Sequence, residues 1–299
     1  MTAVRSPRPA AGIRSLRRRR IRSFLPPLRA LPWILTLVLG CVPAAAVEGE
    51  RVAPFVVSPE RDVERMLDLA DVGPQDYLVD LGSGDGRIVI AAGRRGALAH
   101  GVEIETKLVE QARERARAAG VEDRVAFVEG DLFEADIRHA SVVMLYLFPE
   151  ANLRLRPQLL RTLEPGTRVV SNSFDMGDWR PDEHIESATS SGIRMWIIPA
   201  RVEGEWILRI GGERRRMELL QVYQHLAGEM ETASGSARLR SPALHGGRVR
   251  FEAVLGGVPH RFSGRIEDGL MTGTVHRDQD DRTRVDAWTA IREVPGDGR

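Results

Sequence analysis

The chain has 299 residues, of which 42% are hydrophobic and 28% are charged, and its 43 basic and 42 acidic side chains nearly balance. This composition is too apolar for a disordered chain and too charged for a polytopic membrane protein. Cys41 is the only cysteine, so a disulfide framework within the chain and a zinc site of clustered cysteines are both excluded.

The positive charge is concentrated at the N-terminal end. Residues 1–46 contain nine arginines and no acid, which leaves 34 basic against 42 acidic residues, a net charge of −8, for the rest of the chain. Broad binding to nucleic acid depends on cations that neutralise phosphates. The acidic body therefore argues against a nucleic-acid partner.

Residues 1–46 are interpreted as a targeting segment. The cationic stretch Arg17–Arg20 precedes an uncharged, apolar run, and Ala44–Ala46 offers a cleavage site, as in a signal peptide. Val38–Cys41 resembles a lipobox, so a lipoprotein signal is an alternative to a signal peptide or an anchor. We expect the protein to be membrane-associated or exported, with membrane contact only through this segment. A mis-assigned start codon would instead leave it cytoplasmic.

From Arg51 to about Asp182 the chain alternates short apolar segments with segments of helical period, which is the pattern of βαβ units, and we assign residues 47–189 to this domain. Ser58 and Pro59 suit the N-cap and first position of an opening helix. The further elements expected are strands at 77–81, 101–104, 125–128, 141–147 and 167–173, and helices at 87–95, 106–119 and 149–163. We therefore predict an α/β domain with a Rossmann-like sheet and helices on both of its faces.

Residues 190–299 show a different pattern, in which apolar and polar residues alternate, as at Trp206, Leu208 and Ile210. Glycine pairs such as Gly211–Gly212 and Gly256–Gly257 separate the alternating runs, as hairpin turns do. The pattern predicts an antiparallel β domain, either a meander or a small barrel. Its role is not indicated by the sequence.

A glycine-rich loop links the first predicted strand to the next helix. Asp80 lies near the end of the strand, and Gly82, Gly84 and Gly86 follow at alternate positions. Glycine lets the backbone turn tightly and approach a ligand without a Cβ in the way. The helix N-terminus behind the loop offers free N–H groups to an anionic group of that ligand. With Ser83 and Asp85, these residues form the predicted core of a cofactor site.

Acidic residues follow the next two strands. Glu103 closes the second strand, where a carboxylate can accept hydrogen bonds from both ribose hydroxyls of an adenosine. Asp131 follows the third strand, where its carboxylate could accept the adenine amino group, and Leu132 beside it completes the predicted cofactor-binding set. Asp80 and Asp85 would repel a pyrophosphate but suit a ligand with an ammonium and a sulfonium group. The spacing therefore favours S-adenosylmethionine over a dinucleotide.

Asp80–Arg87, Glu103 and Asp131 resemble motif I and the following acidic positions of class I, seven-strand methyltransferases. More narrowly, residues 52–183 are similar to the small lysine methyltransferases of the ATP synthase c-subunit and the adenine nucleotide translocase, and to their bacterial relatives. The stretches that carry this narrower resemblance are Pro54–Pro59, Tyr146–Glu150 and Phe174–Trp179. The resemblance implies a class I methyltransferase sheet, S-adenosylmethionine as cofactor and the lysine of a protein, near a membrane, as acceptor.

The predicted acceptor site lies after the fourth strand, at the carboxyl edge of the sheet. We expect Tyr146 to orient the acceptor amine or the cofactor, Phe148 to form a pocket wall and Glu150 to supply the nearby acid. The seven histidines are scattered, so no metal site is expected. Two alternatives remain open: a small-molecule methyltransferase on the same fold, and an exported binding protein whose cofactor site is vestigial.

Overall fold

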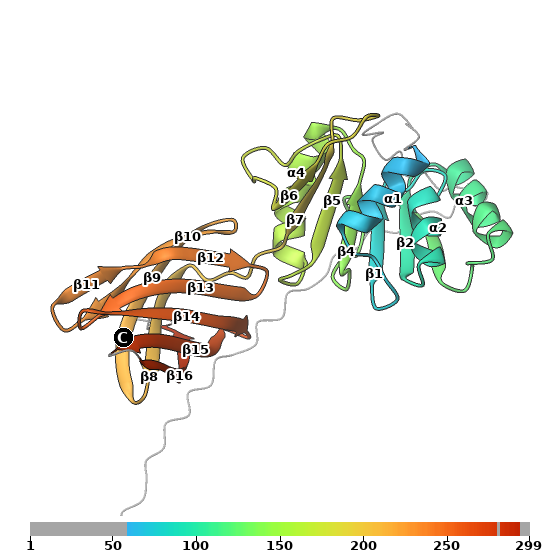
Figure 1. Cartoon of the computed structure of the whole chain (residues 1–299). Helices are drawn as coiled ribbons and strands as arrows, with labels where there is room; N and C mark the ends of the chain where they lie inside the picture. The colour runs from blue at the N-terminus through green and yellow to red at the C-terminus, as the bar shows by residue number, and fades with distance from the viewer. Residues whose placement is uncertain (1–58, 280–281, 294–299) are drawn as a thin grey trace, which may run out of the picture. The chain divides into compact units, whose positions relative to one another are not determined.

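The structure, a computed structural model, describes residues 59–279 and 282–293 (Figure 1). The predicted targeting segment, residues 1–46, and the stretch before Pro59 lie outside the described residues. Within the described ranges, no helix is long and apolar enough to cross a membrane. The described residues belong to one compact unit, Glu48–Arg299, which contains a mixed sheet with helices and then an antiparallel barrel.

The first sheet has seven strands in the order β3-β2-β1-β4-β5-β7-β6. The strands are β1 (Tyr77–Leu81), β2 (Leu98–Glu103), β3 (Val125–Glu129), β4 (Val142–Leu145), β5 (Arg168–Asn172), β6 (Glu183–Ile185) and β7 (Ile193–Ile197). The first five are parallel, and β7 runs antiparallel to both β5 and β6. The strand order reverses direction at β1, which lies between β2 and β4, and ligands bind at such switch points in open α/β sheets.

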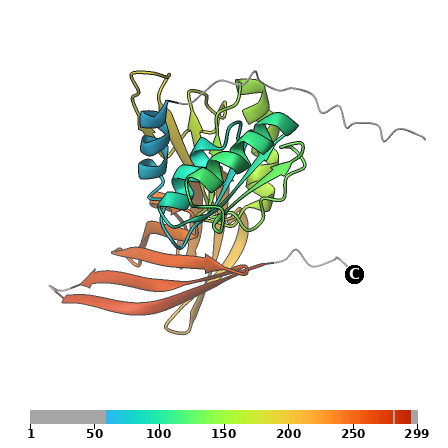
Figure 2. The same cartoon turned by 90° about the vertical axis from the view of Figure 1, so that its right-hand side faces the viewer.

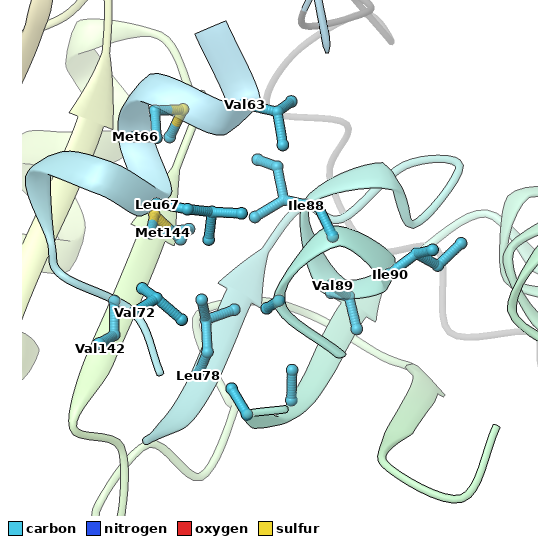
Figure 3. Packing of buried hydrophobic residues seen from close by; sticks show 14 of the residues in the cluster. Val63, Met66, Leu67, Val72, Leu78, Ile88, Val89, Ile90, Val142 and Met144 are labelled. Atoms are coloured by element: carbon cyan, nitrogen blue, oxygen red, sulfur yellow. The ribbon is translucent and has the colours of Figure 1, made fainter. Parts of the chain in front are cut away.

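Helices cover both faces of this sheet, as predicted. They are α1 (Glu60–Leu69), α2 (Arg87–Arg94), α3 (Thr106–Ala118) and α4 (Pro149–Thr162). The core on one face contains apolar residues of α1, α2 and α3, and Figure 3 shows Met66 and Leu67 of α1 packed near Met144 of β4. The core on the other face contains Leu155 and Leu159 of α4. Successive residues of β1, Leu78 and Val79, enter opposite cores, as the pleat requires.

The mixed sheet extends beyond the domain boundary expected at residue 189. β7 pairs with β5 along Arg168–Asn172, so residues up to Ile197 belong to the first domain. The alternating pattern that begins near residue 190 is the pattern of any half-buried strand, and it does not reveal which sheet the strand joins.

The second domain is a nine-stranded antiparallel sheet in the order β11-β10-β9-β8-β16-β15-β14-β13-β12 (Figures 1 and 2). The strands are β8 (Gly204–Ile210), β9 (Glu213–Val222), β10 (His225–Thr232), β11 (Gly235–Arg238), β12 (Arg240–His245), β13 (Arg248–Leu255), β14 (Val258–Glu267), β15 (Leu270–Gln279) and β16 (Arg282–Arg292). The edge strands β11 and β12 are separated only by Leu239, whose N–H donates to Gly228 O of β10 at 2.9 Å. The sheet therefore curls into a nearly closed barrel, one of the two predicted forms.

The barrel is filled by its own side chains rather than open to a ligand at its centre. Trp206, Trp288, Phe251 and Phe262 are at most 2% exposed and belong to one core cluster. The ring of Trp288 requires a glycine beside it, because a Cβ at residue 264 would lie 2.6 Å from that ring. The barrel therefore has a packed aromatic core.

Candidate functional site

The glycine loop, residues 82–86, leaves the carboxyl end of β1 in a conformation that needs its glycines. Gly82, Gly84 and Gly86 have φ values of 80°, 54° and 78°, in the left-handed region that favours glycine. A Cβ on Gly86 would lie 2.6 Å from the ring of Phe127. Gly82 N and Ser83 N both donate to Val102 O of β2, at 2.9 and 3.0 Å. The loop therefore turns sharply over the end of β2.

Glu103 fastens the glycine loop to β2. Its carboxylate accepts the backbone N–H groups of Gly84 at 2.9 Å, Ile104 at 2.8 Å and Glu105 at 3.0 Å. A carboxylate offers about four acceptor positions, so one remains for a ligand. Glu103 thus supports the loop in addition to its predicted contact with a ribose, and that contact stays a prediction.

Asp80 is a buried carboxylate with an exposed fraction of only 2%. Burial, and then the negative charges of Glu103 and Asp85, raise the pKa of Asp80 to about 8. Each of these causes disfavours the ionised form, so a cation placed beside Asp80 would stabilise its carboxylate. The surroundings of Asp80 therefore favour its neutral, protonated form.

Asp85 lies close enough to act on Asp80, but its own carboxylate is paired with two guanidinium groups. Arg87 donates to its two oxygens at 2.9 and 2.6 Å, and Arg115 of α3 forms an ion pair with the same carboxylate. Burial alone would raise the pKa of Asp85, but the hydrogen bonds and charges of Arg87 and Arg115 outweigh burial and lower it. Since its charge is already neutralised, Asp85 holds the loop against α3 and adds little attraction for a cation.

Three other residues were predicted to bind the cofactor: Ser83 in the glycine loop, and Asp131 and Leu132 after β3. The Ser83 hydroxyl is buried and finds no hydrogen-bond partner in the described part of the chain. Asp131 accepts the N–H of Phe133 at 2.9 Å through one oxygen, Oδ1, in a local turn. Leu132 is half-buried, with a methyl 3.8 Å from the position of a Cβ on Gly82. The contacts of Ser83, Asp131 and Leu132 with a cofactor stay predictions.

The predicted acceptor residues follow β4 at the same edge of the sheet. Tyr146 is half-buried, and its hydroxyl makes no hydrogen bond to any residue that the structure describes. Phe148 is 37% exposed, and Glu150 is exposed in the first turn of α4. Phe148 meets Phe174 edge to face, with ring centroids 5.8 Å apart. An aromatic wall therefore forms at the ends of β4 and β5.

Phe174 was not among the predicted site residues. It lies in the loop of residues 173–180, here named the β5 loop, which follows β5 directly. The position after a parallel strand at the carboxyl edge is the signal that could have identified it. Asn172, the last residue of β5, is also fully buried, and its side-chain nitrogen has no partner among the described residues.

The described residues contain no group of three or more histidine, cysteine, aspartate or glutamate side chains that could hold a metal ion.

Comparisons with known proteins agree on the first domain. Residues 80–183 match the family model described as the ANTKMT methyltransferase domain, which ends before the barrel begins. A protein-lysine N-methyltransferase of Saccharolobus islandicus is 42% identical over 135 residues, which cover 44% of this chain and 84% of that protein. The adenine nucleotide translocase lysine N-methyltransferase of Mus musculus is 35% identical over 159 residues, covering 53% of this chain and 68% of that protein.

Two further similarities cover the same part of the chain. The ATP synthase c-subunit lysine N-methyltransferase of Homo sapiens is 36% identical over 148 residues, or 49% of this chain, and the chain spans only 61% of that relative's length. A crystal structure described as an RNA methyltransferase from Salinibacter ruber, bound to S-adenosyl-L-homocysteine, is 53% identical. It covers 49% of this chain and 96% of the other, with a TM-score of 0.48.

Proposed function

Because the chain belongs to the ANTKMT family of class I, S-adenosylmethionine-dependent protein-lysine N-methyltransferases, we propose that it methylates a lysine of a membrane-associated protein. Two relatives are named for lysines of the adenine nucleotide translocase and of the ATP synthase c-subunit, which supports an acceptor of that kind. The observation that carries the proposal is the aromatic wall of Phe148 and Phe174, beside Glu150 and at the same sheet edge as the glycine loop.

The residues around the glycine loop fit S-adenosylmethionine. When bound, this cofactor supplies an electrophilic methyl group on a sulfonium and leaves as a neutral thioether. Glu103 and Asp131 each retain acceptor capacity, for the ribose and the adenine amino group. Ser83 offers an unpaired buried hydroxyl, and the buried carboxylate of Asp80 gains from a nearby cation.

The acceptor side has to prepare a lysine amine for attack. A lysine ε-ammonium must lose a proton before its nitrogen can form a bond to the methyl carbon, and Glu150, an exposed carboxylate in the first turn of α4, can receive it. Phe148 and Phe174 exclude water from the lysine side chain, while Tyr146 orients the nitrogen. Most of the rate then comes from holding the reacting atoms at attack distance, since this displacement needs no covalent intermediate.

We also propose that the N-terminal segment anchors the enzyme to a membrane. The basis is its arginine cluster followed by an uncharged run. An anchor suits the activity better than export, because S-adenosylmethionine is made in the cytosol. Deleting residues 1–46 should move the enzyme from the membrane fraction to the soluble fraction while its cofactor affinity stays the same. Retention of the truncated enzyme on membranes would contradict the anchor.

The function is tested by incubating the enzyme with radioactive S-adenosylmethionine and a membrane fraction. We expect label in a protein band, and mass spectrometry of that band should find the added methyl groups on lysine. Label confined to small metabolites would favour the small-molecule alternative, and label in RNA would contradict a protein acceptor. A protein that binds no S-adenosylmethionine in a calorimetric titration would contradict the enzyme assignment altogether.

A further inference from the structure

The turn between β9 and β10 has no glycine at its centre, unlike four other hairpin turns of the barrel. Its two central residues are Tyr223 and Gln224, whereas four other turns have glycine at one or both central positions. Those turns are at residues 211–212, 246–247, 256–257 and 268–269. Tyr223 has a φ of 53°, in the left-handed region that is costly for a bulky side chain. Local turn preference does not account for these residues, so contacts elsewhere must compensate for the strain.

Both side chains reach the β5 loop of the first domain. Gln224 accepts a hydrogen bond from the indole N–H of Trp179 at 3.0 Å and donates to Arg180 O at 2.8 Å. The ring of Tyr223 stacks on Trp179, with centroids 5.7 Å apart and an interplanar angle of 18°. Its hydroxyl donates to Asp178 at 3.1 Å. The turn therefore contacts three consecutive residues of the loop.

Helix α4 holds the same loop from its own side. Arg156 donates to Met176 O at 2.6 Å and forms an ion pair with Asp178. Asn152, fully buried in the first half of α4, donates to Asp175 O at 3.3 Å. The loop is thus fastened at Asp175 and Met176 by α4 and at its far end by the barrel turn, while Phe174 at its start forms the aromatic wall.

We propose that Tyr223 and Gln224 are positioning residues for methyl transfer, through which the barrel holds the β5 loop and hence Phe174 in the acceptor site. The inference rests on the proposed function and assigns a role to a domain that lies outside the matched family region. Small displacements in an active site are costly, since an error of about 1 Å in the position of a reacting group can lower a rate 100-fold. The contacts of Tyr223 and Gln224 with the β5 loop offset the strain of the turn.

The test replaces both residues at once, as Tyr223→Asn with Gln224→Gly. Asn-Gly is the preferred sequence for a two-residue hairpin turn, so the barrel should fold at least as readily while the contacts to the β5 loop are lost. We expect the double variant to label membrane protein at least tenfold more slowly than the parent enzyme. Both enzymes are assayed over the same dilution series of one membrane preparation. The dissociation constant for S-adenosylmethionine should stay within twofold, and the melting temperature within a few degrees.

Hydrogen–deuterium exchange supplies a readout that does not depend on activity. In the double variant the backbone amides of residues 174–180 should exchange faster than in the parent. The exchange rate of the glycine loop should stay the same. The matched control places the same pair in the β10–β11 turn, as Ala233→Asn with Ser234→Gly, where both residues are exposed. The control should match the parent in turnover and in exchange of the β5 loop. Tyr223→Phe, which keeps the ring stack, should retain more turnover than the double variant.

The outcomes separate this inference from the proposed function. If the parent enzyme labels a lysine and the double variant does so at the same rate, the positioning role is wrong. Unchanged exchange in the β5 loop would also overturn it, even if turnover falls. If the parent enzyme labels no protein, the proposed function fails, and the exchange experiment alone decides whether the barrel turn holds the loop.

Discussion

The carboxylate of Glu103 accepts the backbone N–H of Gly84 at 2.9 Å, so the last residue of β2 holds the middle of the glycine loop. The same carboxylate is predicted to bind the ribose of the cofactor, in which case one acidic side chain would serve two purposes. Losing it would release the loop and remove a ligand contact together.

Glu103→Ala should weaken S-adenosylmethionine binding by about 1–3 kcal/mol, the usual cost of losing a hydrogen bond to a charged group. This corresponds to a roughly 5- to 150-fold higher dissociation constant in a calorimetric titration. Glu129→Ala is the matched control, since Glu129 ends the neighbouring strand and its carboxylate accepts a hydrogen bond from the exposed Thr106 hydroxyl rather than from the glycine loop. Equal affinities for Glu103→Ala and the parent would remove Glu103 from the cofactor site.

Asp80 should make the stability of the protein depend on pH. Its pKa is about 8 in the folded chain against 3.8 for an ordinary aspartate. Between these values the folded state holds a proton that the unfolded chain has lost, so the contribution of Asp80 to stability decreases as pH rises across the interval. Asp80→Asn removes this decrease. The melting temperature of Asp80→Asn minus that of the parent should therefore increase from pH 5 to pH 9. Both proteins are measured without cofactor.

The same variant should bind S-adenosylmethionine more weakly than the parent, because an amide offers no negative charge to a cation. A melting-temperature difference that stays constant with pH would show that Asp80 titrates normally. A variant that gains stability in alkali and keeps full cofactor affinity would show that the charge of Asp80 does not contribute to binding.

Asp85 should behave in the opposite way, since its pKa is lowered rather than raised. Asp85→Asn should destabilise the protein by about 1–3 kcal/mol at neutral pH, because Arg87 and Arg115 lose a charged acceptor. The stabilisation is present above the ordinary pKa of aspartate and is lost as pH falls through the lowered value, so parent and variant should converge in acid. Urea unfolding at pH 7 and pH 3 measures the difference in the free energy of unfolding between the parent and the variant, which should be smaller at pH 3.

Asp136→Asn is the control for that experiment. Asp136 forms a comparable pair with Arg138, but both side chains are exposed, so the pair is screened by solvent and little change in the free energy of unfolding is expected.

Cofactor affinity tests the role of Asp85 separately. A larger loss of cofactor affinity in Asp85→Asn than in Glu103→Ala would show that Asp85 contacts the cofactor.

Tyr146→Phe should lower methyl transfer more than it lowers cofactor binding. The hydroxyl has no hydrogen-bond partner in the described chain, so removing it should not cost stability. An interaction made only with the acceptor affects turnover while the cofactor dissociation constant stays the same. Initial rates on a membrane fraction, set beside calorimetric titration, provide the comparison. Equal losses of rate and affinity would place Tyr146 with the cofactor.

Much of the architecture follows from local patterns in the sequence. Apolar strands that alternate with helical periods predicted the mixed sheet, and alternation with glycine turns predicted the barrel. The structure confirms both. The glycine loop and the acids after β2 and β3 could be grouped in advance, because the carboxyl ends of parallel strands meet at one edge of a sheet.

Other features depend on residues far apart in the chain. The sequence suggested that Asp85 would attract a cation, but α3 brings Arg115 to it across 30 positions. The place of β7 in the first sheet depends on its pairing with β5, which a periodic pattern does not specify.

The sequence by itself therefore determined the elements and the class of cofactor, because hydrophobic period, glycine conformation and charge act over a few residues. Only the tertiary structure decided which carboxylate is neutralised and which is left buried without a partner charge in the described part of the chain. It also decided that Gln224 of the barrel accepts a hydrogen bond from Trp179 of the β5 loop. These outcomes depend on burial and on contacts between distant segments, which exist only once the chain is packed.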